Sequence, residues 1–344
     1  MRVTTLTGAA LAVATLLGTA VLVGQTSAPR PAGAAGSPRA TAGTGVERAW
    51  VAPKTPWGDP DLQGSWDNGT PTPLERPADL ADREFLSDEE WKRRADEVAN
   101  RAATRPGNAA ADVELAYDNE WWDRGAPLKR TSLIVDPPNG KLPPLTPEGQ
   151  ALLARRAESA KARGRYDSYT DRPLQERCLV YHGVPPMPTG YNNNYLIVQT
   201  RDTVAIRYEM LAETRIIPLD RRPHLGKRLT QWLGNSRGRW EGDTLVVETT
   251  GFSPSTTFRF PVDHATLKVV ERFRRLSDDE IDYRFTIENP TMYTRPFTAV
   301  LPLMKTTNQI YEYACHEGNH GLEGVLRGAR FEERQAEEKA RQPR

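Results

Sequence analysis

The sequence has very little cysteine and almost no excess charge of either sign. Only 2 of the 344 residues are cysteine, and 46 Lys and Arg balance 45 Asp and Glu, which gives a formal net charge of +1. This balance provides no field that would recruit nucleic acid or an anionic membrane, so we expect neither as a partner. Phosphate-cradling glycine motifs and the G-x-S-x-G elbow of α/β-hydrolases are also missing. These absences favour a protein that uses no cofactor.

A long apolar run occurs at the N-terminus, where residues 3–24 are uncharged and follow Arg2. This layout predicts a signal peptide over residues 1–34, because small-x-small cleavage sites end at Ala28 and at Ala34. The alternative is an uncleaved membrane anchor, since the run is long enough to span a bilayer. Residues 35–56 predict a disordered linker. We therefore expect a secreted or extracytoplasmic protein without stable membrane insertion after signal cleavage.

The two cysteines, Cys178 and Cys315, predict a disulfide, because an exported chain reaches an oxidising compartment. The alternative is a pair of buried thiols.

Residues 57–175 predict a helix-and-loop segment that packs on the rest of the protein. A capping box at Ser87–Glu90 opens one helix, which ends before Pro106. A second helix is predicted from Thr146 to Gly164, and a short strand precedes the turn at residues 137–140.

Residues 176–330 have the period of strands, and residues 331–344 form a charged tail. Short apolar alternations follow one another with turn signals between them, including a hairpin turn at Gly242-Asp243. The last predicted strands are Phe297–Leu303 and Gln309–Cys315. The sequence therefore predicts a mainly β protein, an antiparallel meander that closes into a barrel, because open sheet edges invite aggregation.

The sequence shows two resemblances, of which the first supports this prediction. Gly64-Ser65-Trp66 resembles the Gly-x-Trp that opens the first strand of lipocalin-like (calycin) barrels. Four longer segments resemble an uncharacterised family of exported proteins from soil bacteria: Tyr191–Tyr195, Asp220–His224, Trp240–Glu248 and Tyr311–Asn319. The second resemblance implies export but no particular activity, and in that family an aromatic residue commonly stands at the position of His320.

The letters His316-Glu317-Gly318-Asn319-His320 match the zinc-protease motif H-E-x-x-H. That motif needs a helix, on which two histidines four residues apart bind one metal. Here it follows a predicted strand, and Gly318 and Asn319 are poor helix formers. We predict no metal site, with the zinc protease as the alternative.

Glu271 is the first candidate for chemistry, because it shares the predicted inward face of Leu267, Val269 and Phe273. An inward carboxylate is costly unless it is paired or functional. It is either a catalytic group or the partner of an inward arginine.

The second candidate site is a set of polar groups at strand ends, which could supply a titratable imidazole and hydrogen bonds. Its catalytic candidates are His224, His316 and Glu317, and its substrate-binding candidates are Tyr191, Asn192, Asn194, Asp220, Arg222, Trp121 and Trp122. The structural alternative is that these residues form turns, caps and a hydrophobic plug.

Two functions fit these observations. The first is a cofactor-independent enzyme of lyase, isomerase or hydrolase type that uses acid–base chemistry on a small apolar or aromatic molecule. The second is a calycin-like protein that binds a small hydrophobic or aromatic molecule without changing it. An enzyme needs its titratable groups to converge on one cavity, whereas a carrier needs only the cavity.

Overall fold

The structure, a computed structural model, describes residues 50–103, 125–162, 164, 166–181, 183–226 and 228–341. All of them belong to one compact unit that starts at residue 49. The predicted signal peptide and most of the predicted linker lie outside the described residues.

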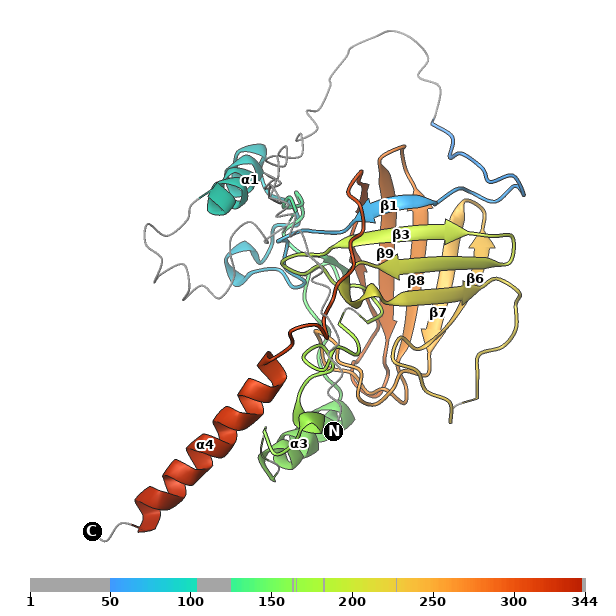
Figure 1. Cartoon of the computed structure of the whole chain (residues 1–344). Helices are drawn as coiled ribbons and strands as arrows, with labels where there is room; N and C mark the ends of the chain where they lie inside the picture. Colours follow the sequence, from blue (N-terminus) through green and yellow to red (C-terminus); the bar gives the residue numbers. More distant parts are fainter. Residues whose placement is uncertain are drawn as a thin grey trace, which may run out of the picture. The chain divides into compact units, whose positions relative to one another are not determined.

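Nine strands follow one another around a single antiparallel sheet, in the order β5-β4-β3-β1-β11-β9-β8-β7-β6. β5 lies beside β6, so the sheet is nearly closed into a barrel (Figure 1). The prediction of a mainly β, antiparallel barrel is therefore confirmed. The nine strands are β1 (Gly64–Asp67), β3 (Asn194–Gln199), β4 (Thr203–Tyr208), β5 (Thr214–Pro218), β6 (Asn235–Glu241), β7 (Thr244–Thr250), β8 (Lys268–Arg275), β9 (Glu280–Glu288) and β11 (Leu303–Lys305).

Two further strands lie off this path: β10 (Phe297–Val300) pairs with β9 and with β2 (Ile134–Asp136). The sequence predicts one strand over Phe297–Leu303, but the structure divides it into β10 and β11. Pro302 stands at the break, and proline has no N–H for a ladder hydrogen bond.

The first barrel strand comes from the segment that the sequence assigns to helices and loops. β1 lies between β3 and β11, so the barrel is not a pure meander. Its Trp66 is fully buried and donates from Nε1 to the carbonyl oxygen of Leu62 at 2.9 Å. The guanidinium of Arg275 lies 5.5 Å from the centre of the Trp66 ring. Gly64-Ser65-Trp66 thus lies in a strand of the barrel, and residues on both sides of position 176 build the same sheet.

Side chains from alternate positions fill the barrel. On β8, Val269, Glu271, Phe273 and Arg275 are buried, whereas Arg272 and Arg274 between them are exposed. The β6–β7 hairpin turns at Gly242, whose φ of 64° is in the left-handed region that glycine tolerates.

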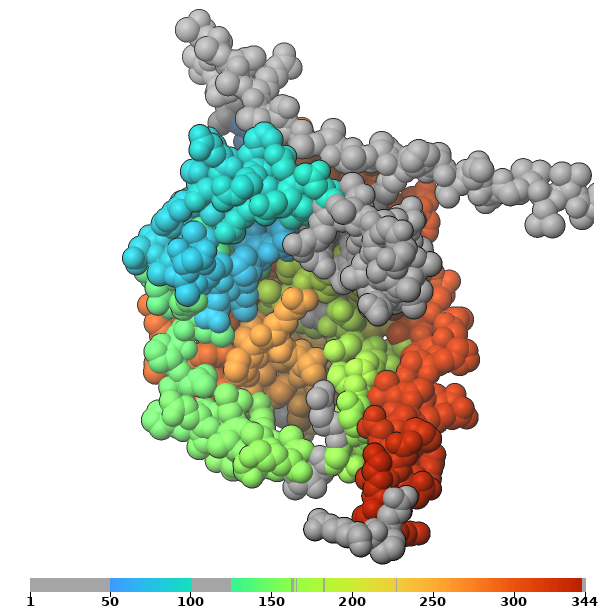
Figure 2. All heavy atoms as spheres, turned by 90° about the vertical axis from the view of Figure 1, so that its left-hand side faces the viewer, coloured from blue at the N-terminus to red at the C-terminus, as the bar shows by residue number. Residues whose placement is uncertain are grey.

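Helices lie outside the sheet, and both predicted N-terminal helices are confirmed. α1 (Asp88–Ala103) begins with the predicted capping box, in which Glu90 N donates to Ser87 Oγ at 3.2 Å and Ser87 N donates to Glu90 Oε2 at 2.9 Å. α3 (Pro147–Ala162) is capped by Thr146, whose Oγ1 accepts from Gly149 N at 2.9 Å. Figure 2 shows residues 50–103 in blue and cyan, α3 in green and the C-terminal segment in red around the orange barrel residues. The described residues also form three short 3-10 turns: Ala78–Leu80, Tyr169–Asp171 and Met210–Ala212.

The C-terminal part differs from the prediction. Residues 309–315 form no strand, and β11 before them is paired on both sides. α4 (Gly321–Arg341) then crosses the predicted boundary between barrel and tail at residue 330. None of its residues is buried. No helix among the described residues has the length and apolar character needed to cross a membrane.

Candidate functional site

The barrel interior contains a buried ion pair. Glu271 on β8 is 0% exposed, and its carboxylate accepts from Arg215 Nη1 on β5 at 3.0 Å and from the Tyr283 hydroxyl on β9 at 2.9 Å. The Arg215 guanidinium also donates from Nε to Ser236 Oγ at 2.8 Å and from Nη2 to Thr249 Oγ1 at 2.7 Å. Glu271 is therefore a paired structural carboxylate, which is the second of the two roles that the sequence left open for it.

Almost no space remains beside this network. The adjoining cavity leaves about 10 Å³ for the centre of a water molecule, which is roughly what one water needs. Burial raises the pKa of Tyr195, Tyr208 and Tyr283, which line the cavity, so all three phenols stay neutral. The space beside this network is therefore too small for a ligand of the calycin kind.

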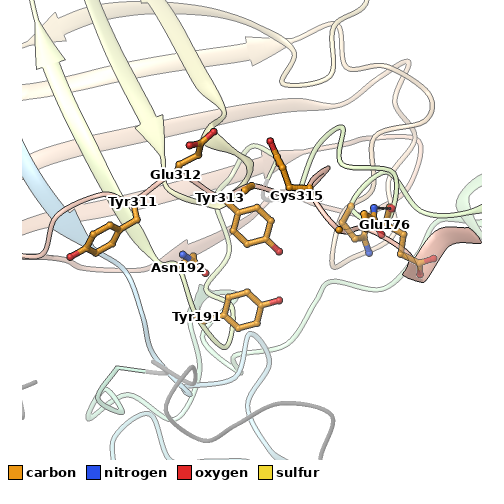
Figure 3. Close-up of a pocket in the computed structure, with 12 residues that line it drawn as sticks. Glu176, Tyr191, Asn192, Tyr311, Glu312, Tyr313 and Cys315 are labelled. Carbon is orange, nitrogen blue, oxygen red and sulfur yellow. Dashed lines mark hydrogen bonds between the residues drawn. The ribbon is translucent and has the colours of Figure 1, made fainter. Parts of the chain in front are cut away.

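A larger cleft lies outside the barrel, and we call it the tyrosine cleft. Its volume is about 720 Å³. Tyr191 and Tyr313 both line it, and in Figure 3 their hydroxyl ends are directed to the side on which Glu176 lies. Three segments line the cleft: Gln175 and Glu176; Tyr191 and Asn192; and Tyr311, Glu312, Tyr313, Ala314, Cys315, Glu317, Gly318 and Asn319.

The predicted disulfide holds two of these segments together. Cys178 and Cys315 are bonded, with 5.7 Å between their Cα atoms, and Cys315 itself lines the cleft. Beside the bond, Asn319 Nδ2 donates to the carbonyl oxygen of Glu176 at 3.3 Å. Because residues 306–320 belong to no strand or helix, this bond is the principal link between the two walls.

The third wall is shaped by the run of asparagines before β3. Asn192 has a φ of 54°, in the left-handed region that asparagine tolerates better than most residues. The side chain of Asn193 bridges the backbone of Thr189, accepting from its N at 2.8 Å and donating to its O at 3.1 Å. Asn194 is buried and donates to Glu209 Oε2 at 2.6 Å. Of the predicted ligand-binding residues in this run, Tyr191 and Asn192 line the cleft and Asn194 does not.

The charged side chains that line the cleft are all acidic among the residues that the structure describes. Glu176 is paired with Arg172, whose Nε and Nη2 each donate to its carboxylate at 2.8 Å. Glu312 and Glu317 form no ion pair within the described chain, and both are exposed. The cleft therefore combines aromatic rings with two uncompensated carboxylates.

Several predicted residues lie elsewhere. Asp220 and Arg222 contact each other in the loop after β5, where the Arg222 backbone N–H, which donates to the carboxylate at 3.1 Å, lowers the pKa of Asp220. In the same loop, His224 Nδ1 lies 3.3 Å from Asn235 Oδ1. His316 is exposed in the turn beside the cleft but does not line it. Trp121 and Trp122 lie outside the described residues.

The segment His316–His320 forms a turn ahead of α4 and not a helix, as the sequence predicts. Gly318 has a φ of 68°, and Asn319 N donates to His316 O at 3.3 Å. No group of three or more metal-ligating side chains is gathered anywhere in the described part of the chain.

Sequence reasoning missed the rest of the cleft: Glu176, Tyr311, Glu312, Tyr313 and Asn319. The predicted strand over Gln309–Cys315 hid three of them, Tyr311, Glu312 and Tyr313, because a strand sends alternate side chains to opposite faces of a sheet. The predicted disulfide could have indicated these residues, because it requires the segment around Cys178 to lie against the segment around Cys315.

Comparison with protein-family models, with curated proteins and with solved structures finds no match for this chain.

Proposed function

We propose that this is an exported binding protein that holds a small aromatic molecule in the tyrosine cleft, outside the barrel. The observation that carries the proposal is a cleft of about 720 Å³ whose lining includes the tyrosines Tyr191, Tyr311 and Tyr313 (Figure 3). A ring that stacks on tyrosine gains about 0.5–1.5 kcal/mol beyond the area that it buries. The volume lies within the range typical of small-molecule sites.

Export is part of the proposal. The apolar run at residues 3–24 and the Cys178–Cys315 bond support a location outside the cytoplasm, where disulfides persist. The nearly closed barrel supports a calycin-like origin, and the four quoted segments support membership of the exported soil-bacterial family. In this proposal the barrel is the scaffold and the ligand lies on its outside.

The position of the titratable groups favours binding over catalysis. The catalytic hypothesis requires His224, His316, Glu317 and Glu271 to converge. Glu271 is buried in a salt bridge, His224 contacts Asn235 in another loop, and only Glu317 lines the cleft. A carrier requires no such convergence.

The test is a ligand screen by NMR on the mature, oxidised protein with a library of small aromatic compounds, followed by calorimetric titration of the hits. Tyr313→Leu and Tyr191→Leu should each weaken binding about tenfold, since each removes one stacking face. The matched control is Phe331→Leu, which removes an exposed ring of α4 that does not line the cleft. A library without any hit, or equal affinity in all three variants, would reject the proposal.

A second candidate is an acid–base enzyme that works in the same cleft. One observation favours it: Glu317, a predicted catalytic residue, shares the cleft with phenol hydroxyls and Glu312. Removal of a true general acid or base costs roughly 10²–10⁴ in rate. Mass spectrometry of each bound ligand after incubation decides between the two, because a carrier returns its ligand unchanged, whereas an enzyme yields a product that Glu317→Gln suppresses.

A further inference from the structure

We infer that the ligand of the tyrosine cleft is an organic cation, a molecule with an aromatic ring and an ammonium group. This inference rests on the proposed function and adds to it the charge of the ligand. It follows from the charges of the cleft, from the tyrosine rings and from the absence of cationic side chains on the described lining.

The first argument is charge complementarity. The described lining includes three carboxylates and no Lys, Arg or His. Arg172 compensates only Glu176, so Glu312 and Glu317 keep a net negative charge at the cleft. These carboxylates would repel an anionic ligand, and an uncharged ligand would gain no ionic attraction from them.

The second argument comes from the rings. The face of a tyrosine ring carries negative potential, and a cation within about 6 Å of its centre is attracted by it. Tyr191 and Tyr313 both line the cleft (Figure 3), so an ammonium group bound there would meet tyrosine rings. Ring faces and carboxylates therefore favour the same sign of charge, and the aromatic part of the ligand gains stacking in addition.

The two carboxylates should not contribute equally. Glu312 and Tyr313 point in opposite directions from their segment (Figure 3), so Glu312 points away from the Tyr313 ring. Both groups are exposed, and solvent ions screen exposed charges over about 10 Å at 0.1 M salt. We expect Glu312 to contribute little of the preference and the whole preference to depend on salt.

A bare metal ion does not fit this lining. Metal binding needs a close set of ligands, and the described residues gather no such group of three or more. An organic cation needs no coordination shell, because it is bound by ring faces and by charge at longer range.

The experiment compares three ligands with one ring: 2-phenylethylammonium, 2-phenylethanol and 3-phenylpropanoate. Each is titrated into the mature, oxidised protein by NMR at 50 mM salt. The ammonium should bind about tenfold tighter than the alcohol, and the carboxylate should bind weakest. Raising the salt to 500 mM should reduce the affinity for the ammonium and leave that for the alcohol unchanged.

Two variants test the source of the preference. Glu317→Gln together with Glu312→Gln should reduce the ammonium-to-alcohol preference to about threefold or less while affinity for the alcohol is kept, which also shows that the cleft is intact. Glu312→Gln alone should change the preference by less than a factor of two. The control is Glu338→Gln on exposed α4, outside the cleft lining, which should change nothing.

The outcomes separate the two proposals. If the alcohol binds as tightly as the ammonium, the cation inference is wrong and aromatic binding stands. If none of the three ligands binds and the aromatic library gives no hit, the proposed function itself is wrong. Preference for the carboxylate would also overturn the inference.

Discussion

The barrel interior and the tyrosine cleft both bring tyrosines together with glutamates, but in opposite surroundings. Glu271 is 0% exposed and accepts hydrogen bonds from Arg215 and Tyr283. Glu317 in the cleft is exposed and has no ion pair in the described chain. A buried carboxylate without a partner would cost several kcal/mol, so burial forces pairing. Only the solvated site can keep a charge available for a ligand.

The two regions also differ in what holds them. The barrel is fixed by ladders between neighbouring strands, for example eight residue pairs between β8 and β9. The cleft segment at residues 306–320 has no ladder, and the Cys178–Cys315 bond ties it to the opposite wall. Changes to the barrel should therefore alter stability, and changes to the cleft should alter binding.

The disulfide joins two walls of the cleft, and its removal should have the largest effect. The bond closes a segment of 137 residues, and the loop-entropy model gives roughly 4–5 kcal/mol for so long a loop. Cys178→Ser with Cys315→Ser should lower the free energy of unfolding by up to that amount, as followed by circular dichroism in urea. The same variant should lose ligand binding under conditions in which the barrel is still folded. Unchanged affinity in the folded double variant would show that the cleft does not depend on the bond.

Arg215→Met should give the next largest effect, because it leaves the Glu271 carboxylate buried without its cation. Breaking a buried pair from one side costs about 3–5 kcal/mol, measured as free energy of unfolding in urea. The control is Arg272→Met on the outer face of β8, where Arg272 is half exposed in its pair with Glu241 and the loss should be far smaller.

A double variant sharpens this test. Arg215→Met with Glu271→Met removes both charges and should recover part of the stability, since an apolar pair of similar volume can replace a buried ion pair. No recovery would mean that the pair has a role besides neutralising its own charges, which would return Glu271 to the functional candidates.

The sequence predicts the barrel well because its signals are local. Alternation on β8, the Gly242 turn and the Ser87 capping box each depend on a few neighbouring residues, and all three are found where they are predicted. The position of β1 is different. Gly64-x-Trp66 indicates a strand. The residues around it do not indicate that this strand pairs with β3 and β11, because both partners are far away in the sequence.

The cleft was only partly predictable for the same reason. Tyr191, Asn192 and Glu317 were selected as polar groups at strand ends, and the structure places all three on the cleft lining. Asp220, Arg222 and His224 were selected by the same rule and lie in a separate loop. A position at the end of a strand indicates which residues are candidates, but it does not show which of them lie together at one site. Tyr313 was missed because apolar and aromatic alternation looks the same in a strand and in an extended segment without a partner.

Tyr283→Phe should have a smaller effect on the barrel than the loss of Arg215. It removes the hydroxyl that donates to Glu271 at 2.9 Å and leaves the ring in place. A hydrogen bond to a charged group contributes about 1.5–3 kcal/mol. The free energy of unfolding measured in urea should therefore fall by that amount. Ligand affinity in the cleft should stay the same. A change in affinity without a change in stability would contradict the separation of the two regions.

The smallest effect that we expect is a dependence of barrel stability on pH through His264. This half-buried side chain lies in the connection between β7 and β8, with Nε2 2.7 Å from Thr256 O. Burial lowers its pKa, and the charge of Arg156 acts in the same direction. The unfolded chain, in which histidine has its usual pKa near 6.5, then binds a proton more readily than the folded protein. Stability from this group is therefore complete above pH 6.5 and is lost as the pH falls through the lowered pKa of the folded state.

The measurement is the free energy of unfolding in urea at several pH values between 7.5 and 5.5, in the wild type and in His264→Gln. The variant removes the titrating group and keeps an amide that can donate to Thr256, so its stability should fall less steeply toward low pH. His316→Gln, in the exposed turn beside the cleft, is the control and should retain the slope of the wild type. Equal slopes in the wild type and in His264→Gln would show that this ring is no more costly to charge in the folded protein than in water. In that case the contrast between the barrel, where buried charges must be paired, and the cleft, where carboxylates stay unpaired, would not apply to the connection between β7 and β8.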